Sequence, residues 1–242
     1  MTVVSAASPG LMIAVGERLR ILIVAGIPCG VLVAGVGSRL AMLVLRLTSP
    51  DARGVTSDDG FVIGTVSIGG TYNLLVIGAT VGLLGAALYR IVEPWLIGPS
   101  WFRRATVAAA SGAVIGSLLL HADGVDFTLL QPTWLAISLF ILLPALFGAV
   151  IGVVVDRVAA PSSWTRRGKT RWILPTVLVA CFPLTLVLVV LVTVVLVLWT
   201  PMVEAAREVG QRPGVQLVAR AVGLLVTVAG LAAVINDITQ IA

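Results

Sequence analysis

Charged residues are scarce in this 242-residue chain, at 11% of the sequence, whereas a soluble domain carries roughly 25%. Hydrophobic residues make up 59%, and the mean hydropathy is +1.11. This composition excludes an ordinary soluble protein and predicts an all-α, polytopic membrane protein. Nucleic acid is not an expected partner, because no basic patch of the kind that binds phosphate backbones is present.

Histidine and cysteine are also scarce. His121 is the only histidine, and the two cysteines, Cys29 and Cys181, both lie in apolar stretches. Neither a disulfide nor a cysteine-based metal site is therefore expected. The chain has no glycine-rich phosphate loop and no Gly-x-Ser-x-Gly motif. The pair Asp58-Asp59 lacks the third acid of an Asp-Asp-x-x-Asp magnesium motif, so we expect no metal ion and no cofactor.

Apolar runs long enough to span a bilayer recur along the whole chain, which we interpret as one integral membrane domain, residues 1–242, in the cell membrane. The expected transmembrane helices are six: 20–46, 69–91, 105–121, 133–157, 172–199 and 216–237. With the N-terminus inside, the inner segments carry ten basic and four acidic residues, and the outer segments carry six and seven. The positive-inside rule then places both termini in the cytoplasm.

Pairs of glycines four residues apart occur in the first four predicted helices, and such pairs let helix backbones approach closely. They are Gly26/Gly30, Gly78/Gly82, Gly112/Gly116 and Gly148/Gly152. Helices 1 to 4 should therefore form the packed core. The segment 172–199 has no glycine and is apolar all around, so we expect it to face lipid or a protein partner. Pro144, Pro175 and Pro183 should kink the helices that contain them.

Two outer loops together hold five of the eleven acidic residues and the only histidine. Loop 1, residues 48–68, contains Asp58-Asp59-Gly60, a turn signal between strand-like stretches, and predicts a short β-hairpin. Loop 3, residues 121–132, contains His121, Asp123 and Asp126. Ionisable groups are costly near lipid, so this concentration is a functional-site hypothesis. The alternative is that these acids are simply solvated and the Asp-Gly pair is only a turn.

The chemistry that these residues favour is acid catalysis on a lipophilic substrate. Two carboxyl groups in close contact resist double ionisation, so one keeps a proton at neutral pH and can protonate an alkene or epoxide. The candidate acids are Asp58, Asp59, Asp123 and Asp126, with His121 and Arg39 tuning them. Aromatic faces would stabilise the carbocation. The candidate substrate-binding residues besides Arg39 are Phe61, Tyr72, Asn73, Phe127, Trp134 and Phe140.

Three stretches of the sequence resemble known membrane proteins. Residues 46–60 (RLTSPDARGVTSDDG), 69–73 (GGTYN) and 121–128 (HADGVDFT) resemble small actinobacterial multi-pass proteins, mostly of unassigned function. In size, helical plan and scattered acids the chain is also similar to the integral-membrane terpene cyclases. That resemblance implies metal-independent cyclisation of a prenylated substrate, started by a membrane-embedded carboxyl group. No catalytic residue is transferred from that group to this sequence.

Two other functional classes stay open. A non-enzymatic scaffold or partner subunit agrees with the short loops and the long apolar helix 172–199, which could bind another protein. A lipid or small-molecule transporter is also possible, although the predicted helices 69–91, 133–157 and 172–199 have no charge at their centres, where ion transporters usually hold ionisable groups. A serine hydrolase is a lesser alternative, because nothing selects a serine partner for His121.

Overall fold

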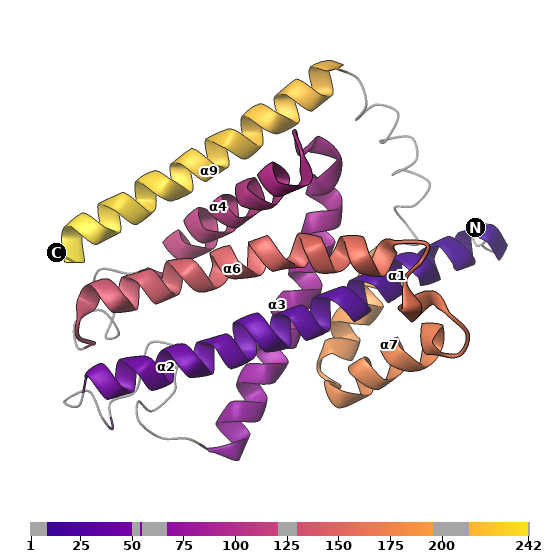
Figure 1. Ribbon diagram of the computed structural model, residues 1–242, viewed down its shortest axis with the longest axis horizontal. Coiled ribbons are helices and arrows are strands. Elements are labelled where there is room, and N and C mark those ends of the chain that lie inside the picture. The colour runs from indigo at the N-terminus through magenta and orange to yellow at the C-terminus, as the bar shows by residue number, and fades with distance from the viewer. Residues whose placement is uncertain (1–8, 50–53, 55–66, 121–129, 196–212, 242) are drawn as a thin grey trace, which may run out of the picture.

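The computed structural model describes residues 9–49, 54, 67–120, 130–195 and 213–241 (Figure 1). Within these residues the chain is almost entirely helical and contains no strand, which confirms the all-α class. The hairpin predicted in loop 1 lies outside the described residues. The helical elements follow one another as α1 Pro9–Cys29, the π-helix η1 Gly30–Val36, α2 Gly37–Thr48, α3 Ile68–Val92, the 3₁₀ turn η3 Glu93–Trp95, α4 Ser100–Leu119, α6 Thr133–Ala159, the 3₁₀ turn η4 Trp164–Arg166, α7 Thr170–Cys181, a short helix Thr185–Val195, and α9 Pro213–Ile241.

In the described ranges, four helical stretches are long and apolar enough to cross a membrane, and they indicate an integral membrane protein. They are Met12–Thr48, Ile68–Trp95, Thr133–Ala159 and Pro213–Gln240. Helix α4 covers the predicted span 105–121 but is not among them, because Arg103, Arg104 and several small polar residues lower its hydropathy. The predicted count of six spans is therefore not confirmed.

The apolar segment predicted as one helix over 172–199 is broken. Helix α7 ends at Cys181, and a second helix begins at Thr185. Pro183 has no backbone N–H, and the Thr185 amide and hydroxyl both donate to the carbonyl of Phe182, at 2.9 and 2.7 Å, which caps the break. In Figure 1 the second helix folds back beside α7 instead of continuing it. One side of this pair is buried against the core, so the segment does not face lipid all around.

Two hydrophobic cores hold the bundle together. The first lies where α1, α3 and α6 meet, around Ile27, Leu83 and Val155, and α7 and the helix Thr185–Val195 pack against it. The second joins the ends of α2, α4 and α9 to the start of α6 through five buried residues. These are Leu45, Leu120, Leu130, Ala136 and Val234. We call the end of the bundle around Leu120 and Leu130 the loop end, and the end around Arg20 and Trp95 the basic end.

Helix α9 runs from the basic end to the loop end. Near its start, Arg220 Nε donates to the carbonyl of Trp95 at 3.3 Å, and near its end Val234 packs into the second core. Helix α1 begins at the basic end, so the N- and C-terminal helices reach opposite ends of the bundle (Figure 1). The prediction that both termini lie on one side is thus not confirmed. The segment predicted as one helix across the bundle, 172–199, instead folds back after α7.

The glycine pairs predicted to be packing sites do lie at helix contacts. At the crossing of α1 and η1 with α3, a Cβ on Gly26 would lie 2.6 Å from the carbonyl oxygen of Gly82. Likewise, a Cβ on Gly78 would lie 2.8 Å from the carbonyl oxygen of Gly30. Only glycine lets the backbones come so close. The π-helix η1 coincides with this crossing and follows Pro28, whose missing N–H interrupts the α-helical hydrogen bonds.

Candidate functional site

The stems of the two acidic loops meet at the loop end. Ser49, which follows α2, accepts a hydrogen bond from the Gln131 amide at 2.7 Å and donates one to the Gln131 carbonyl at 2.9 Å. Ser49 is 3% exposed, so both bonds are shielded from solvent. The beginning of loop 1 and the end of loop 3 are therefore tied together. The hypothesis that loops 1 and 3 form one functional site requires such a contact, which the sequence alone does not reveal.

The second hydrophobic core lies next to this contact and fixes it in place. Leu45 is four residues before Ser49, and Leu130 is next to Gln131; both are buried at about 4% exposure. Because Leu120 and Val234 complete the same cluster, the ends of α4 and α9 are held against the two loop stems. The loop end is thus a packed platform rather than a set of independent helix termini.

The predicted acids themselves lie outside the described residues. So do His121 and two of the predicted aromatic walls; the full set is Asp58, Asp59, Phe61, His121, Asp123, Asp126 and Phe127. Their flanks are described: Thr48, Ser49 and Ser67 for loop 1, and Leu120, Leu130 and Gln131 for loop 3. The Ser49–Gln131 contact therefore shows which loop stems meet, and the positions of the acids stay a prediction.

The other predicted binding residues are distributed over the bundle. Phe140 is half-buried and packs against the second core, and Arg39 is half-buried on α2. Trp134 is 67% exposed. The hydroxyl of Tyr72 donates to the carbonyl of Cys181 at the end of α7, at 3.3 Å, and the neighbouring Asn73 is exposed. Of this set, the structure thus brings Phe140 to the loop-end core, whereas Tyr72 is engaged with α7.

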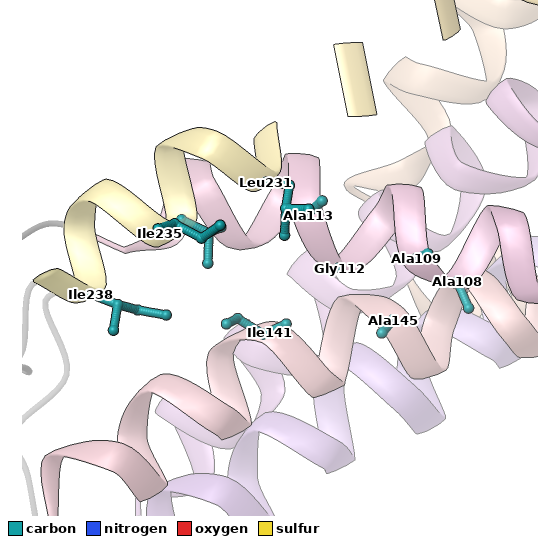
Figure 2. Close-up of a pocket in the computed structure, with 10 residues that line it drawn as sticks. Ala108, Ala109, Gly112, Ala113, Ile141, Ala145, Leu231, Ile235 and Ile238 are labelled. Atoms are coloured by element: carbon teal, nitrogen blue, oxygen red, sulfur yellow. The ribbon is translucent and has the colours of Figure 1, made fainter. Parts of the chain in front are cut away.

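An apolar groove of about 420 Å³ runs between α4, α6 and α9. Small residues of α4 line one side, and branched side chains of α6 and α9 face each other across the open space (Figure 2). The lining residues are Ala108, Ala109, Gly112, Ala113, Ile141, Ala145, Leu231, Val234, Ile235 and Ile238. Val234 also belongs to the second core, so the groove adjoins the loop end. The aromatic residues predicted to bind substrate do not line this groove, whose described walls are aliphatic.

Sequence reasoning missed this groove, although a signal was present. The run Ala108-Ala109-Ala110-Ser111-Gly112-Ala113 places small side chains on every face of α4. On one face they admit α6, since a Cβ on Gly112 would lie 3.1 Å from the Cβ of Ala145. On the neighbouring face they leave the space below α9 unfilled. The pattern was assigned to helix packing alone.

A buried ionic cluster at the basic end was also missed. Arg20 is 2% exposed and holds Glu17 through two hydrogen bonds, Nε to Oε2 at 3.1 Å and Nη2 to Oε1 at 2.8 Å. Its remaining donors bond Thr165 Oγ1 at 2.7 Å and the Val158 carbonyl at 3.1 Å. Arg20 therefore ties α1 to the end of α6 and to η4. The i, i+3 spacing of Glu17 and Arg20 is the only sequence signal for this pair.

Among the residues that the structure describes, no three His, Cys, Asp or Glu side chains gather in a way that could hold a metal ion. Comparison of the chain with models of known protein families, with curated protein sequences and with solved structures gives no match.

Proposed function

We propose that this protein binds a lipophilic, prenylated compound in the groove between α4, α6 and α9 and cyclises it by protonation, without a metal ion. The observation that carries the proposal is the hydrogen-bonded contact between Ser49 and Gln131. It joins the stems of the two loops that contain the acids. The adjoining groove has aliphatic walls that suit a prenyl chain and would exclude water from a carbocation.

The groove and loop 3 are linked through the chain. Helices α4 and α6 form two of the groove walls, and loop 3, with His121, Asp123 and Asp126, connects them. A chain lying in the groove would thus have one end close to the segment that carries the candidate acids. Substrate dissolved in the bilayer would enter sideways between the helices, because the groove is not enclosed. Loop 1, with Asp58 and Asp59, would complete the acid group.

The proposed reaction is balanced without a cofactor. A protonated aspartate donates its proton to the less substituted carbon of the terminal double bond of the substrate, and the π electrons form the new C–H bond. The resulting cation is attacked by the next double bond, which forms a C–C bond and closes a ring. A carboxylate then removes a proton from the final cation, so the product is an isomer of the substrate.

The charge distribution supports a multi-pass protein of the cell membrane with the basic end in the cytoplasm. The described residues at the basic end include eleven Lys or Arg and three acids. At the loop end they include two Arg and one Asp. The positive-inside rule favours this orientation, with the acidic loops on the outer side.

Product profiling tests the proposal. The wild-type chain, expressed in a bacterial host and supplied with prenylated compounds, should give a new isomer of unchanged mass. Asp126→Asn and Asp59→Asn should reduce it by about 100-fold or more if both acids serve proton transfer. Ala109→Phe should fill the groove and abolish the product. Ala105→Phe, one turn earlier on α4 and outside the groove lining, is the matched control and should retain activity.

A second function shares the same groove. Because the groove is open to the side and its described lining is entirely apolar, it also suits binding or carriage of a lipid without chemistry. A carrier or scaffold would bind the prenylated compound, lose binding in Ala109→Phe, and give no isomer. The product assay therefore separates the two functions.

A further inference from the structure

The connection between α6 and α7 gathers positive charge at the basic end. Arg166, Arg167, Lys169 and Arg171 lie within six residues, and all four are exposed or half-exposed. In the described part of the chain, the carboxylate that pairs with this segment is Glu17. It accepts an ion pair from Arg166 Nε at 3.2 Å and from Arg171 Nη2 at 3.4 Å, in addition to its bonds with Arg20.

One carboxylate thus faces three guanidinium groups, so the cluster keeps two uncompensated positive charges. Arg167 has only a weak contact, with the Ser162 carbonyl at 3.5 Å, and Lys169 has no ion pair within the described part of the chain. The Nε of Arg171 is buried and finds no acceptor among the described residues. The exposed Arg167 guanidinium and Lys169 ammonium are therefore available for an anion.

Two tryptophans place this cluster at the level of lipid headgroups. Trp164 and Trp172 flank the basic residues and are 65% and 58% exposed. The ring of Trp172 faces Gly16 of α1, where an added Cβ would lie 3.6 Å from the ring, and the Arg171 guanidinium lies 5.2 Å from the ring centroid. Exposed tryptophans at the ends of spanning helices lie at the membrane–water interface. The guanidinium and ammonium groups between them therefore reach the layer of lipid phosphates.

We propose that the segment Trp164–Trp172, anchored on Glu17, is a binding site for the phosphate headgroup of an acidic phospholipid. Guanidinium groups match phosphate oxygens in bidentate geometry, and a cluster of four or more Lys or Arg next to a spanning helix favours anionic lipids. Arg20 is the positioning residue, because it fixes Glu17 and Thr165. This site is separate from the groove and does not depend on the proposed cyclase activity.

Tryptophan quenching by brominated lipids tests the site. The full chain is reconstituted in phosphatidylcholine vesicles with a rising fraction of dibrominated phosphatidylglycerol, or of dibrominated phosphatidylcholine as reference. The acidic lipid should quench at a lower fraction than the reference lipid. Arg167→Gln with Lys169→Gln should weaken this preference about 25-fold, at about fivefold per charge. These two side chains hold no internal ion pair, so the variant should fold.

Three comparisons decide the outcome. Arg46→Gln removes one charge at the loop end and should leave the preference unchanged. Replacing Trp172 by Phe should reduce the quenching by the acidic lipid selectively. Inorganic phosphate at millimolar concentration should not relieve the quenching; full relief would assign the site to a free anion instead. Equal quenching by both lipids, or an unchanged preference in the double variant, would overturn the proposal.

Discussion

The crossing of α1 and η1 with α3 offers a sharp test of how this bundle is packed. A Cβ added to Gly82 would lie 2.7 Å from the Cα of Gly30, whereas ordinary contacts begin at 3.4 Å. The obstructing atoms belong to the backbone, so no side chain can rotate away. The Cβ would come closer still to the carbonyl oxygen of Gly26. In Gly82→Ala the two helices must therefore separate by at least about 0.7 Å, and a gap of that size already loses a quarter to a half of the dispersion energy of the contacts along the crossing.

The magnitude follows from two opposing terms. Overpacking of a tight contact costs about 1–3 kcal/mol, and replacing a helical glycine by alanine returns at most about 1 kcal/mol. We expect Gly82→Ala to lower the free energy of unfolding by about 1–2 kcal/mol. Gly223→Ala, in the middle of α9 where a Cβ meets nothing within 4 Å, should leave it unchanged or raise it slightly.

Equilibrium unfolding in mixed micelles of dodecyl maltoside and sodium dodecyl sulfate, followed by far-UV circular dichroism, measures both variants. Because the chemical change is identical, the difference between them isolates the cost of the crossing. Equal stabilities for Gly82→Ala, Gly223→Ala and the wild type would refute the claim that glycine is required at this contact.

Two further predictions concern the polar contacts at the two ends. Arg20→Ala leaves Thr165 and the Val158 carbonyl without this partner in a buried setting, and it should destabilise the protein by about 3–5 kcal/mol in the same unfolding assay. Arg46→Ala, at a half-buried position, is the comparison. A loss below about 1 kcal/mol for Arg20→Ala would contradict this reasoning. Ser49→Ala should cost about 1–3 kcal/mol and, if the loop stems position the acids, should also reduce product formation; full activity would argue against that role.

Much of the helical architecture could be predicted, because the length and hydropathy of a sequence segment identify a membrane-spanning helix. The predicted 69–91 and 133–157 agree with α3 and α6 to within two residues at each end. The glycine pairs were identified correctly as contacts, since a missing side chain in an apolar helix has little other use. The partner of each pair was not predictable, because it depends on how the helices cross.

The fold-back after α7 could not be derived from hydropathy. Residues 172–199 are apolar throughout, and Pro183 was expected to kink one helix, whereas the chain reverses there. A proline both kinks and ends helices, and tertiary packing of Thr185 and Val189 against the first core decides between these outcomes. The predicted cytoplasmic location of the C-terminus is not confirmed for the same reason.

The candidate site was only partly accessible from the sequence. Its acids were identified by their cost near lipid, and the structure adds the contact of the two loop stems. The groove was missed because its walls are alanine, glycine and isoleucine, residues that every membrane bundle contains. Aromatic residues were predicted to line the site and stabilise a carbocation. However, Trp134 is exposed, and the Tyr72 hydroxyl donates a hydrogen bond to α7.

Incorporation of solvent deuterium tests protonation-initiated cyclisation most directly. The purified protein in vesicles is given an alkene-terminated prenylated substrate in D₂O, and products are analysed by mass-resolved chromatography. If a carboxyl proton starts the reaction, the cyclic isomer carries one deuterium on carbon and is 1 Da heavier than the isomer formed in H₂O, and Asp126→Asn forms neither. A cyclic isomer without deuterium, or no isomer from well-folded protein, would contradict the proposed mechanism.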